Sequence, residues 1–182
     1  MPEPIRAGII GCDTSHCTTF AKLFHDEKGK DHVPGVRIVA AYPSFSKDIA
    51  SSADRVEGFT KQLETDFGVK ITKSIDELVG QCDAFLIESV DGRRHRPELE
   101  AVAKAGKPVF VDKPFAASLV DAKAMVELAR QAKIPCFSAS SLRFNDAFQD
   151  FVKDSKHGKV FGCDAHSPAH LEPTNPGFYW YG

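Results

Sequence analysis

The sequence predicts an α/β fold with a doubly wound parallel sheet, followed by the incomplete start of a second α/β domain. Short apolar segments with the length of buried strands recur at residues 5–10, 36–42, 69–72, 83–89, 107–112 and 135–140. Amphipathic helical patterns separate them, and the first strand passes through a glycine turn directly into a helix. Strands that alternate with helices in this way are typical of a mostly parallel sheet.

The helices also carry end signals. After the first helix, helical patterns cover residues 53–67, 74–82, 97–105 and 119–132. Gly68 ends the first of these, and Ser74 caps the next with Glu77 three residues later. Pro97 suits the first turn of its helix, so the charged residues 91–96 before it favour a solvated loop.

The pattern changes after residue 141. Residues 144–156 favour a helix and residues 159–167 a strand, and the remaining residues are rich in aromatics and proline without clear periodicity. A lone strand cannot build a second core. We therefore expect one domain over residues 1–141 and the incomplete start of another over residues 142–182.

Composition and cysteine usage exclude several classes of protein. A net charge of -2 gives no general attraction to nucleic acid or anionic membranes. No apolar run approaches the roughly 20 residues of a membrane span, and the N-terminus lacks a signal-peptide core. Five cysteines without a C-x-x-C pair are best explained as free thiols in a reducing compartment, which favours a cytoplasmic location.

Two groups of possible metal ligands have unsuitable spacing. The first group consists of Cys12, His16 and Cys17, and the second of Asp164, His166, His170 and Glu172. Neither group has the spacing of a compact zinc site. We therefore expect no metal.

The turn after the first strand resembles a dinucleotide-binding fingerprint with substitutions. If Gly11 is the first glycine of G-x-G-x-x-G, Asp13 and His16 stand at the other two positions. The Asp13 carboxylate could face the phosphates, or it could cap the helix by accepting from the amides of Ser15 or His16. In the second case Thr14 and Ser15 could still offer hydroxyls and amides to a pyrophosphate. In the first case we expect Asp13→Gly to tighten cofactor binding.

The end of the second strand lacks the acidic residue that usually holds the cofactor ribose. After this strand ends at Tyr42, the next carboxylate in the sequence is that of Asp48. Hydroxyls such as that of Ser44, together with Lys47, could hold a 2'-phosphate and favour NADP. A plain proline–serine turn explains the same residues equally well.

Three separated motifs resemble one family. Residues 105–116, AGKPVFVDKPFA, resemble the A-G-K-x-V-x-x-E-K-P-x-A signature of the glucose–fructose oxidoreductase / inositol dehydrogenase / MocA family. His95 and the pair Arg143-Phe144 resemble further motifs of that family. The resemblance implies a Rossmann domain, then an α/β domain that holds substrate and often mediates homo-oligomer formation. It also implies hydride transfer between NAD or NADP and a hydroxyl carbon of a sugar-like small molecule.

The same resemblance implies roles for individual residues. Lys113 would be the active-site lysine, where an ammonium can stabilise an alkoxide and relay its proton; alternatively, it is a solvated lysine at a strand end. Asp112 replaces the usual glutamate and should orient the lysine or the ribose. The expected cofactor-binding residues are Gly11, Asp13, Thr14, Ser15, His16, Ser44, Ser89, His95, Asp112 and Pro114. The expected substrate-side residues are Arg143, His166 and His170.

The last residues depart from the family pattern. A G-G-x-x-x-D-x-x-x-H-like segment of the family aligns loosely with residues 176–182, and Trp180 stands where the aspartate is expected. Either the chain is a truncated product or this member has lost part of the machinery. We therefore expect an NAD(P)-dependent oxidoreductase acting on a sugar or polyol. The alternative is a catalytically inactive binding or regulatory protein that keeps the fold.

Overall fold

A computed structural model describes residues 3–154, 156, 158–164, 166 and 172–175 of the chain. Six strands form one parallel sheet in the order β3-β2-β1-β4-β5-β6. Their bounds are Ile5–Ile10 (β1), Val36–Tyr42 (β2), Lys70–Ile71 (β3), Ala84–Ile87 (β4), Val109–Val111 (β5) and Cys136–Phe137 (β6). The predicted doubly wound parallel sheet is confirmed.

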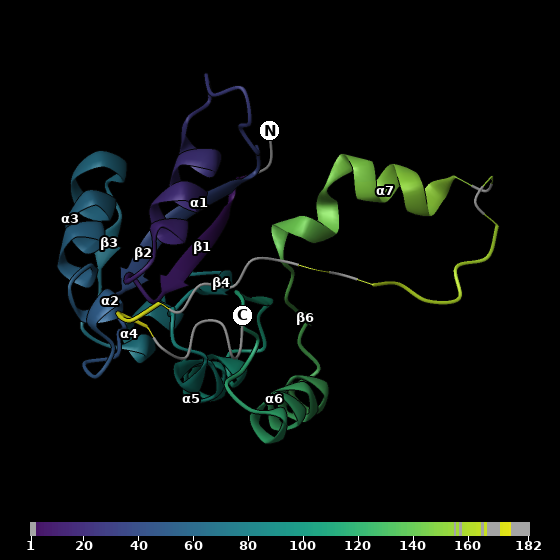
Figure 1. The fold of residues 1–182 in the computed structure, drawn as a ribbon. Coiled ribbons are helices and arrows are strands. Elements are labelled where there is room, and N and C mark those ends of the chain that lie inside the picture. Colours follow the sequence, from purple (N-terminus) through teal and green to yellow (C-terminus); the bar gives the residue numbers. More distant parts are fainter. Residues whose placement is uncertain (1–2, 155, 157, 165, 167–171, 176–182) are drawn as a thin grey trace.

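The helices are α1 (Ser15–His25), α2 (Ala50–Ala53), α3 (Val56–Phe67), α4 (Ile75–Val79), α5 (Gly92–Ala103), α6 (Leu119–Ala132) and α7 (Asp146–Lys153), with a 3₁₀ turn η1 at Ser141–Phe144. The helices that cover the sheet form two layers, and α7 lies apart from them (Figure 1). Helices α1 and α3 pack together on one face, and α4, α5 and α6 cover the other. Among the described residues, no helix is long and apolar enough to cross a bilayer.

This division follows from the handedness of the chain. The strand order reverses between β1 and β4, and right-handed crossovers on either side of that point fall on opposite faces of the sheet. Within the described residues, no crossover helix therefore covers β4, β5 and β6 on the α1 face. The half-buried Phe110 and the exposed Phe137 lie on these uncovered strands.

Each face has its own apolar core. On the α1 side, Ile9, Cys17 and Leu63 are fully buried. On the other side, Phe85 and Met125 belong to a second cluster. The strands supply both clusters because successive side chains point to opposite faces of the sheet.

The start of α5 differs from the prediction. The helix begins at Gly92, not at Pro97, so residues 92–96 are helical and do not form a solvated loop. Asp91 is the N-cap, and its carboxylate accepts from the Arg93 amide at 2.9 Å. A strong cap therefore outweighs the preference of Pro97 for the first turn, at a cost of one backbone hydrogen bond.

Two other predictions need correction. The helix predicted from residue 53 is split into α2 and α3. The strand predicted at residues 159–167 does not form over its described part, residues 159–164 and 166, because no neighbouring strand pairs with it there.

Cys12, Cys17 and Cys82 are buried free thiols as expected, whereas Cys163 is exposed.

We predict that Gly11→Ala destabilises the protein by about 2–4 kcal/mol. Gly11 has a φ of +97°, and a Cβ there would lie 2.2 Å from the backbone nitrogen of Ser89. The control is Gly35→Ala, where φ is +87° and nothing lies within 4 Å, so only the strain of about 1 kcal/mol applies. Urea unfolding monitored by circular dichroism measures both variants. Equal losses of unfolding free energy in the two variants would show that the close packing of Gly11 on Ser89 contributes nothing to stability.

Candidate functional site

The candidate site lies at the carboxyl edge of the sheet, where the strand order reverses. In open α/β sheets, ligands bind in the crevice at this point. The turn after β1, the start of α1, and the residues that follow β4 and β5 meet here. The chain thus brings together Gly11–Thr14, Glu88–Asp91 and Asp112–Pro114, which are far apart in sequence.

Asp13 points into the protein and away from this crevice. Its side chain is fully buried; Oδ2 accepts from the Ser52 hydroxyl at 2.6 Å, and Oδ1 accepts from the Val90 amide at 3.1 Å. The N-cap of α1 is Thr14, whose hydroxyl accepts from the His16 amide at 3.4 Å. Both alternatives considered for Asp13 are therefore wrong, because it neither faces a phosphate nor caps the helix. The charge-based reason for expecting Asp13→Gly to tighten cofactor binding is lost with them.

Ser44, Ser89 and His95 belong to a buried polar network. Glu98 Oε1 accepts from the Ser44 hydroxyl at 2.5 Å and from the Ser89 hydroxyl at 2.8 Å. His95 Nε2 donates to the Ser89 carbonyl at 2.6 Å. Arg94 Nη2 donates to the Ser44 hydroxyl at 2.9 Å. These bonds tie the loops after β2 and β4 to α5, so the three predicted cofactor residues already have partners within the protein.

Glu88 is a buried acid that sequence reasoning missed. It directly follows β4, its side chain is fully buried, and neither carboxylate oxygen has a hydrogen-bond partner among the described residues. Burial raises the pKa of Glu88 well above its usual range, and the charges of Asp112 and Asp13 raise it further. Burial therefore favours the protonated form of Glu88. The only signal in the sequence is a carboxylic acid placed directly after a buried apolar strand.

The cysteines near Glu88 are not activated thiols. Burial raises the pKa of Cys12 and of Cys17, and Glu88 contributes to both shifts. Both side chains remain protonated at neutral pH and pack as small apolar groups. Within the part of the chain that the structure describes, no group of three or more possible ligands is arranged to hold a metal ion.

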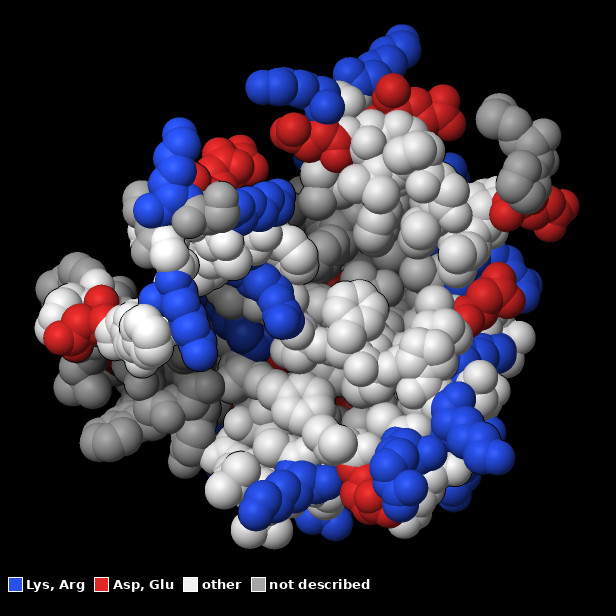
Figure 2. Space-filling view, turned by 90° about the vertical axis from the view of Figure 1, so that its right-hand side faces the viewer, with Lys and Arg blue, Asp and Glu red and all other residues white. Residues whose placement is uncertain are grey.

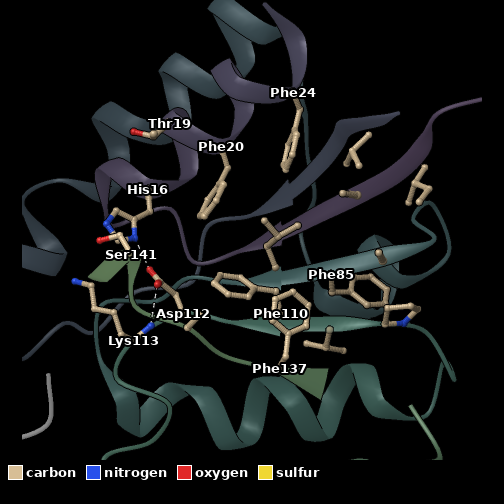
Figure 3. A pocket seen from close by; sticks show the side chains of 18 of the residues that line it. His16, Thr19, Phe20, Phe24, Phe85, Phe110, Asp112, Lys113, Phe137 and Ser141 are labelled. Atoms are coloured by element: carbon tan, nitrogen blue, oxygen red, sulfur yellow. Dashed lines mark hydrogen bonds and ion pairs between the residues drawn. The ribbon is translucent and has the colours of Figure 1, made fainter. Parts of the chain in front are cut away.

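His16, Asp112 and Lys113 form one polar group (Figure 3). His16 Nδ1 forms a hydrogen bond with Asp112 Oδ2, and Asp112 Oδ1 accepts a hydrogen bond from the Lys113 amide at 2.8 Å. The Asp112 side chain is 8% exposed and the His16 side chain 37%. We expected Asp112 to orient the lysine side chain or the ribose. Its carboxylate instead forms hydrogen bonds with the His16 imidazole and the Lys113 backbone amide. Sequence reasoning found all three residues but not the contact between them.

A cavity of about 610 Å³ opens beside this group on the uncovered face of β4, β5 and β6. Phe20 and Phe24 on α1 and Phe110 and Phe137 on the sheet line its apolar part, while His16, Asp112, Lys113 and Ser141 lie at one end (Figure 3). The rings of Phe20 and Phe110 meet edge to face, with centroids 5.9 Å apart. Figure 2 shows a broad face whose centre carries few charged side chains and whose margin carries many. Such a cavity has the size and mixed lining of a small-molecule site.

The start of α1 fits the pyrophosphate of a dinucleotide. The first turn contains no acidic residue, the Asp13 carboxylate is turned inward, and the Asp112 carboxylate is hydrogen-bonded to His16 Nδ1 and the Lys113 amide. The amides and positive dipole end of an 11-residue helix therefore remain suitable for an anion. Gly11 makes the tight turn that such a site requires, and Thr14 and Ser15 lie at the helix start. The residues present fit the group.

The expected substrate-side residues are only partly described. Arg143 lies in η1, two residues after Ser141 of the cavity wall. His166 is largely exposed, and its Nε2 lies 4.0 Å from Asp164 Oδ1. His170 and the segment 176–182, including Trp180, lie outside the described residues.

We predict that Glu88→Gln stabilises the protein increasingly as pH rises above about 4.5. The native protein keeps the Glu88 proton whereas the unfolded chain releases it, so wild-type stability falls with rising pH between the two pKa values. Glutamine cannot ionise, and the advantage of the variant should grow by about 1.4 kcal/mol per pH unit until the folded-state pKa. Urea unfolding at pH 5, 6 and 7 measures this slope.

The control is Glu77→Gln, for which the sign is opposite. A hydrogen bond from the Lys73 amide, together with Lys70, lowers the pKa of the exposed Glu77. Its contribution is present at neutral pH and disappears as the solution is acidified. If the free energies of unfolding of wild type and Glu88→Gln change in parallel with pH, Glu88 is ionised in the folded protein.

Comparison with known proteins agrees with this geometry. The model of the oxidoreductase family with an NAD-binding Rossmann fold matches residues 5–140. A 1,5-anhydro-D-fructose reductase of Ensifer adhaerens is 30% identical over 134 residues, which cover 71% of this chain and 39% of that protein. An inositol 2-dehydrogenase of Cereibacter sphaeroides is 25% identical over 175 residues, which cover 96% and 48%.

Solved structures have the same fold. The WlbA dehydrogenase of Bordetella pertussis, in complex with NADH and UDP-GlcNAcA, matches with a TM-score of 0.68 at 20% identity, over 88% of this chain and 43% of that one. An oxidoreductase of Agrobacterium radiobacter in complex with NAD+, L-tartaric acid and magnesium matches with a TM-score of 0.62 at 25% identity, over 80% and 38%. The chain spans less than half the length of each of these proteins. It belongs to the Gfo/Idh/MocA oxidoreductase family and carries that family's NAD(P)-binding Rossmann domain.

Proposed function

We propose that the protein is an NAD(P)-dependent oxidoreductase that transfers hydride to or from a hydroxyl carbon of a sugar- or polyol-like substrate. The observation that carries this proposal is the position of Lys113, directly after Asp112 and beside the cavity at the carboxyl edge. The names of the reductase and of the inositol dehydrogenase described above support this substrate class.

Lys113 acts on the reacting oxygen. An ammonium group beside a substrate hydroxyl stabilises the negative charge that develops as the carbon–hydrogen bond breaks. A nicotinamide cofactor supplies the hydride acceptor or donor. The Asp112 carboxylate accepts from the Lys113 amide and so fixes the backbone from which the lysine extends.

The cofactor would bind at the start of α1, where backbone amides would hold its pyrophosphate next to the Gly11 turn and the hydroxyls of Thr14 and Ser15. The buried network of Ser44, Ser89, His95 and Glu98 holds the loops around the crevice in place. We propose that Ser44, Ser89, His95 and Asp13 support the loops around the crevice, because their side chains are already hydrogen-bonded within the protein.

The domain organisation and the substrate side follow the same assignment. Residues 1–141 form the cofactor domain, and residues 142–182 begin the substrate domain, with Arg143, His166 and His170 on the substrate side. Pro114 follows the lysine at the cofactor side of the crevice. The protein works as a homo-oligomer in the cytoplasm.

One observation favours the alternative, a binding or regulatory protein without catalysis. The backbone amide of Ser51, at the start of α2, donates to the Thr174 carbonyl at 3.0 Å, and Asn175 is buried. Residues 172–175 thus lie beside α2, which follows β2 at the carboxyl edge of the sheet where a cofactor ribose would bind. A protein that occupies this position with its own chain would bind NADH weakly and show no turnover.

We predict that Lys113→Met lowers kcat about 10²–10⁴-fold and changes NADH affinity by less than about threefold. The lysine acts on the reacting oxygen, whereas the helix start carries most of the cofactor contact. The assay follows NADH and NADPH absorbance with myo-inositol, glucose and 1,5-anhydro-D-fructose. Calorimetric titration gives the affinities.

The matched control is Lys123→Met, an exposed lysine of α6 on the opposite face of the sheet. It should leave both quantities unchanged. Failure of wild type to bind either cofactor at millimolar concentration would refute the proposal. Binding without turnover on all three compounds would favour the alternative.

A further inference from the structure

The His16–Asp112 pair has the arrangement of an oriented acid–base group. We propose that His16 Nε2 is the proton-accepting atom of this site, with Asp112 as the residue that positions its ring. This inference rests on the proposed function. It adds an acid–base group that comes from the dinucleotide-binding domain itself.

Asp112 is well fixed for this role. One carboxylate oxygen accepts from the Lys113 amide at 2.8 Å, and the other is bonded to His16 Nδ1. Its side chain is only 8% exposed, so water competes little for either oxygen. A carboxylate held in this way fixes both the tautomer and the orientation of the imidazole and stabilises the imidazolium that forms.

The tautomer follows from this bond. A carboxylate oxygen can only accept, so the hydrogen of the neutral ring lies on Nδ1 and the lone pair lies on Nε2. No described residue forms a hydrogen bond with Nε2. The ring is 37% exposed and lines the cavity, so its free nitrogen is accessible to a small molecule.

The surroundings of the ring are well defined. Phe20, one turn further along α1, meets the imidazole edge to face with centroids 6.3 Å apart. Lys113 provides a nearby cation at the end of the cavity. The Glu88 side chain is fully buried and forms no hydrogen bond with a described residue, and the Asp13 carboxylate accepts hydrogen bonds from Ser52 and Val90. Asp112 is therefore the carboxylate that bonds His16.

The proposed step is balanced. In the oxidation direction, the O–H bond of the substrate breaks and its proton passes to His16 Nε2. The C–H bond breaks with it, and the hydride goes to the nicotinamide cofactor, NAD or NADP, which is thereby reduced. A carbonyl remains, and the imidazolium returns its proton to water through the exposed side of the ring. Lys113 stabilises the intermediate charge on oxygen.

Side-chain ¹⁵N NMR tests the arrangement without any substrate. The protein has seven histidines, and His16→Asn identifies the signals of His16 by their loss. In the neutral ring we expect the Nδ1–H tautomer for His16 in wild type, and a mixture of tautomers in Asp112→Asn. A dominant Nε2–H tautomer in wild type would overturn the proposal.

Kinetics with the same three compounds then tests the role. The side-chain amide in His16→Asn can still donate a hydrogen bond to Asp112, but it cannot accept a proton at the pH of the assay. His16→Asn should therefore lower kcat about 10²–10⁴-fold, with NADH affinity and unfolding midpoint nearly unchanged. Added imidazole should restore turnover to His16→Ala, and pyrazole, which has a similar shape but is a much weaker base, should not.

The outcomes separate the two proposals. Full turnover of His16→Asn, or weaker NADH binding with unchanged kcat, would overturn the role of His16 and leave the function of Lys113 intact. If wild type shows no turnover, the proposed function fails. The tautomer measurement then decides whether His16 is an oriented acceptor or not.

Discussion

The close approach of the turn after β1 to the residues after β4 positions the whole carboxyl edge. Gly11 leaves no room for a side chain against the Ser89 backbone, and Asp13 accepts from the Val90 amide across the same boundary. These contacts join the two halves of the sheet at the point where the strand order reverses. Because α1 starts directly after this turn, they also fix the direction of its N-terminus and the position of His16.

Burying acids at this boundary has a physical consequence. Asp13, Glu88 and Glu98 lie within the protein, and burial raises the pKa of each. Asp13 and Glu98 accept hydrogen bonds from serine hydroxyls, which offset part of the desolvation cost. Glu88 has no such bond among the described residues, so its burial favours the protonated form.

The open half of the sheet gives the site its shape. In the described part of the chain, right-handed crossovers leave β4, β5 and β6 without a helix on the α1 face, and the resulting cavity is largely apolar. Its polar groups lie at one end only, where His16, Asp112 and Lys113 meet. A hydroxyl group at that end would meet the Lys113 cation and the His16 imidazole, while the rest of the cavity lining is largely apolar.

The sequence by itself determined the order of the elements, the parallel sheet and the residues worth examining. Apolar periodicity places β1, β2 and α6 within their observed bounds, because burial repeats with the period of the local backbone. It misplaced the start of α5, where the Asp91 cap and the proline gave competing signals. Only the tertiary structure decided that Asp13 turns inward, that Glu88 is buried without a partner, and that His16 bonds Asp112. His16 and Asp112 lie 96 residues apart, and no local pattern encodes a contact that arises when two strand ends meet at one edge.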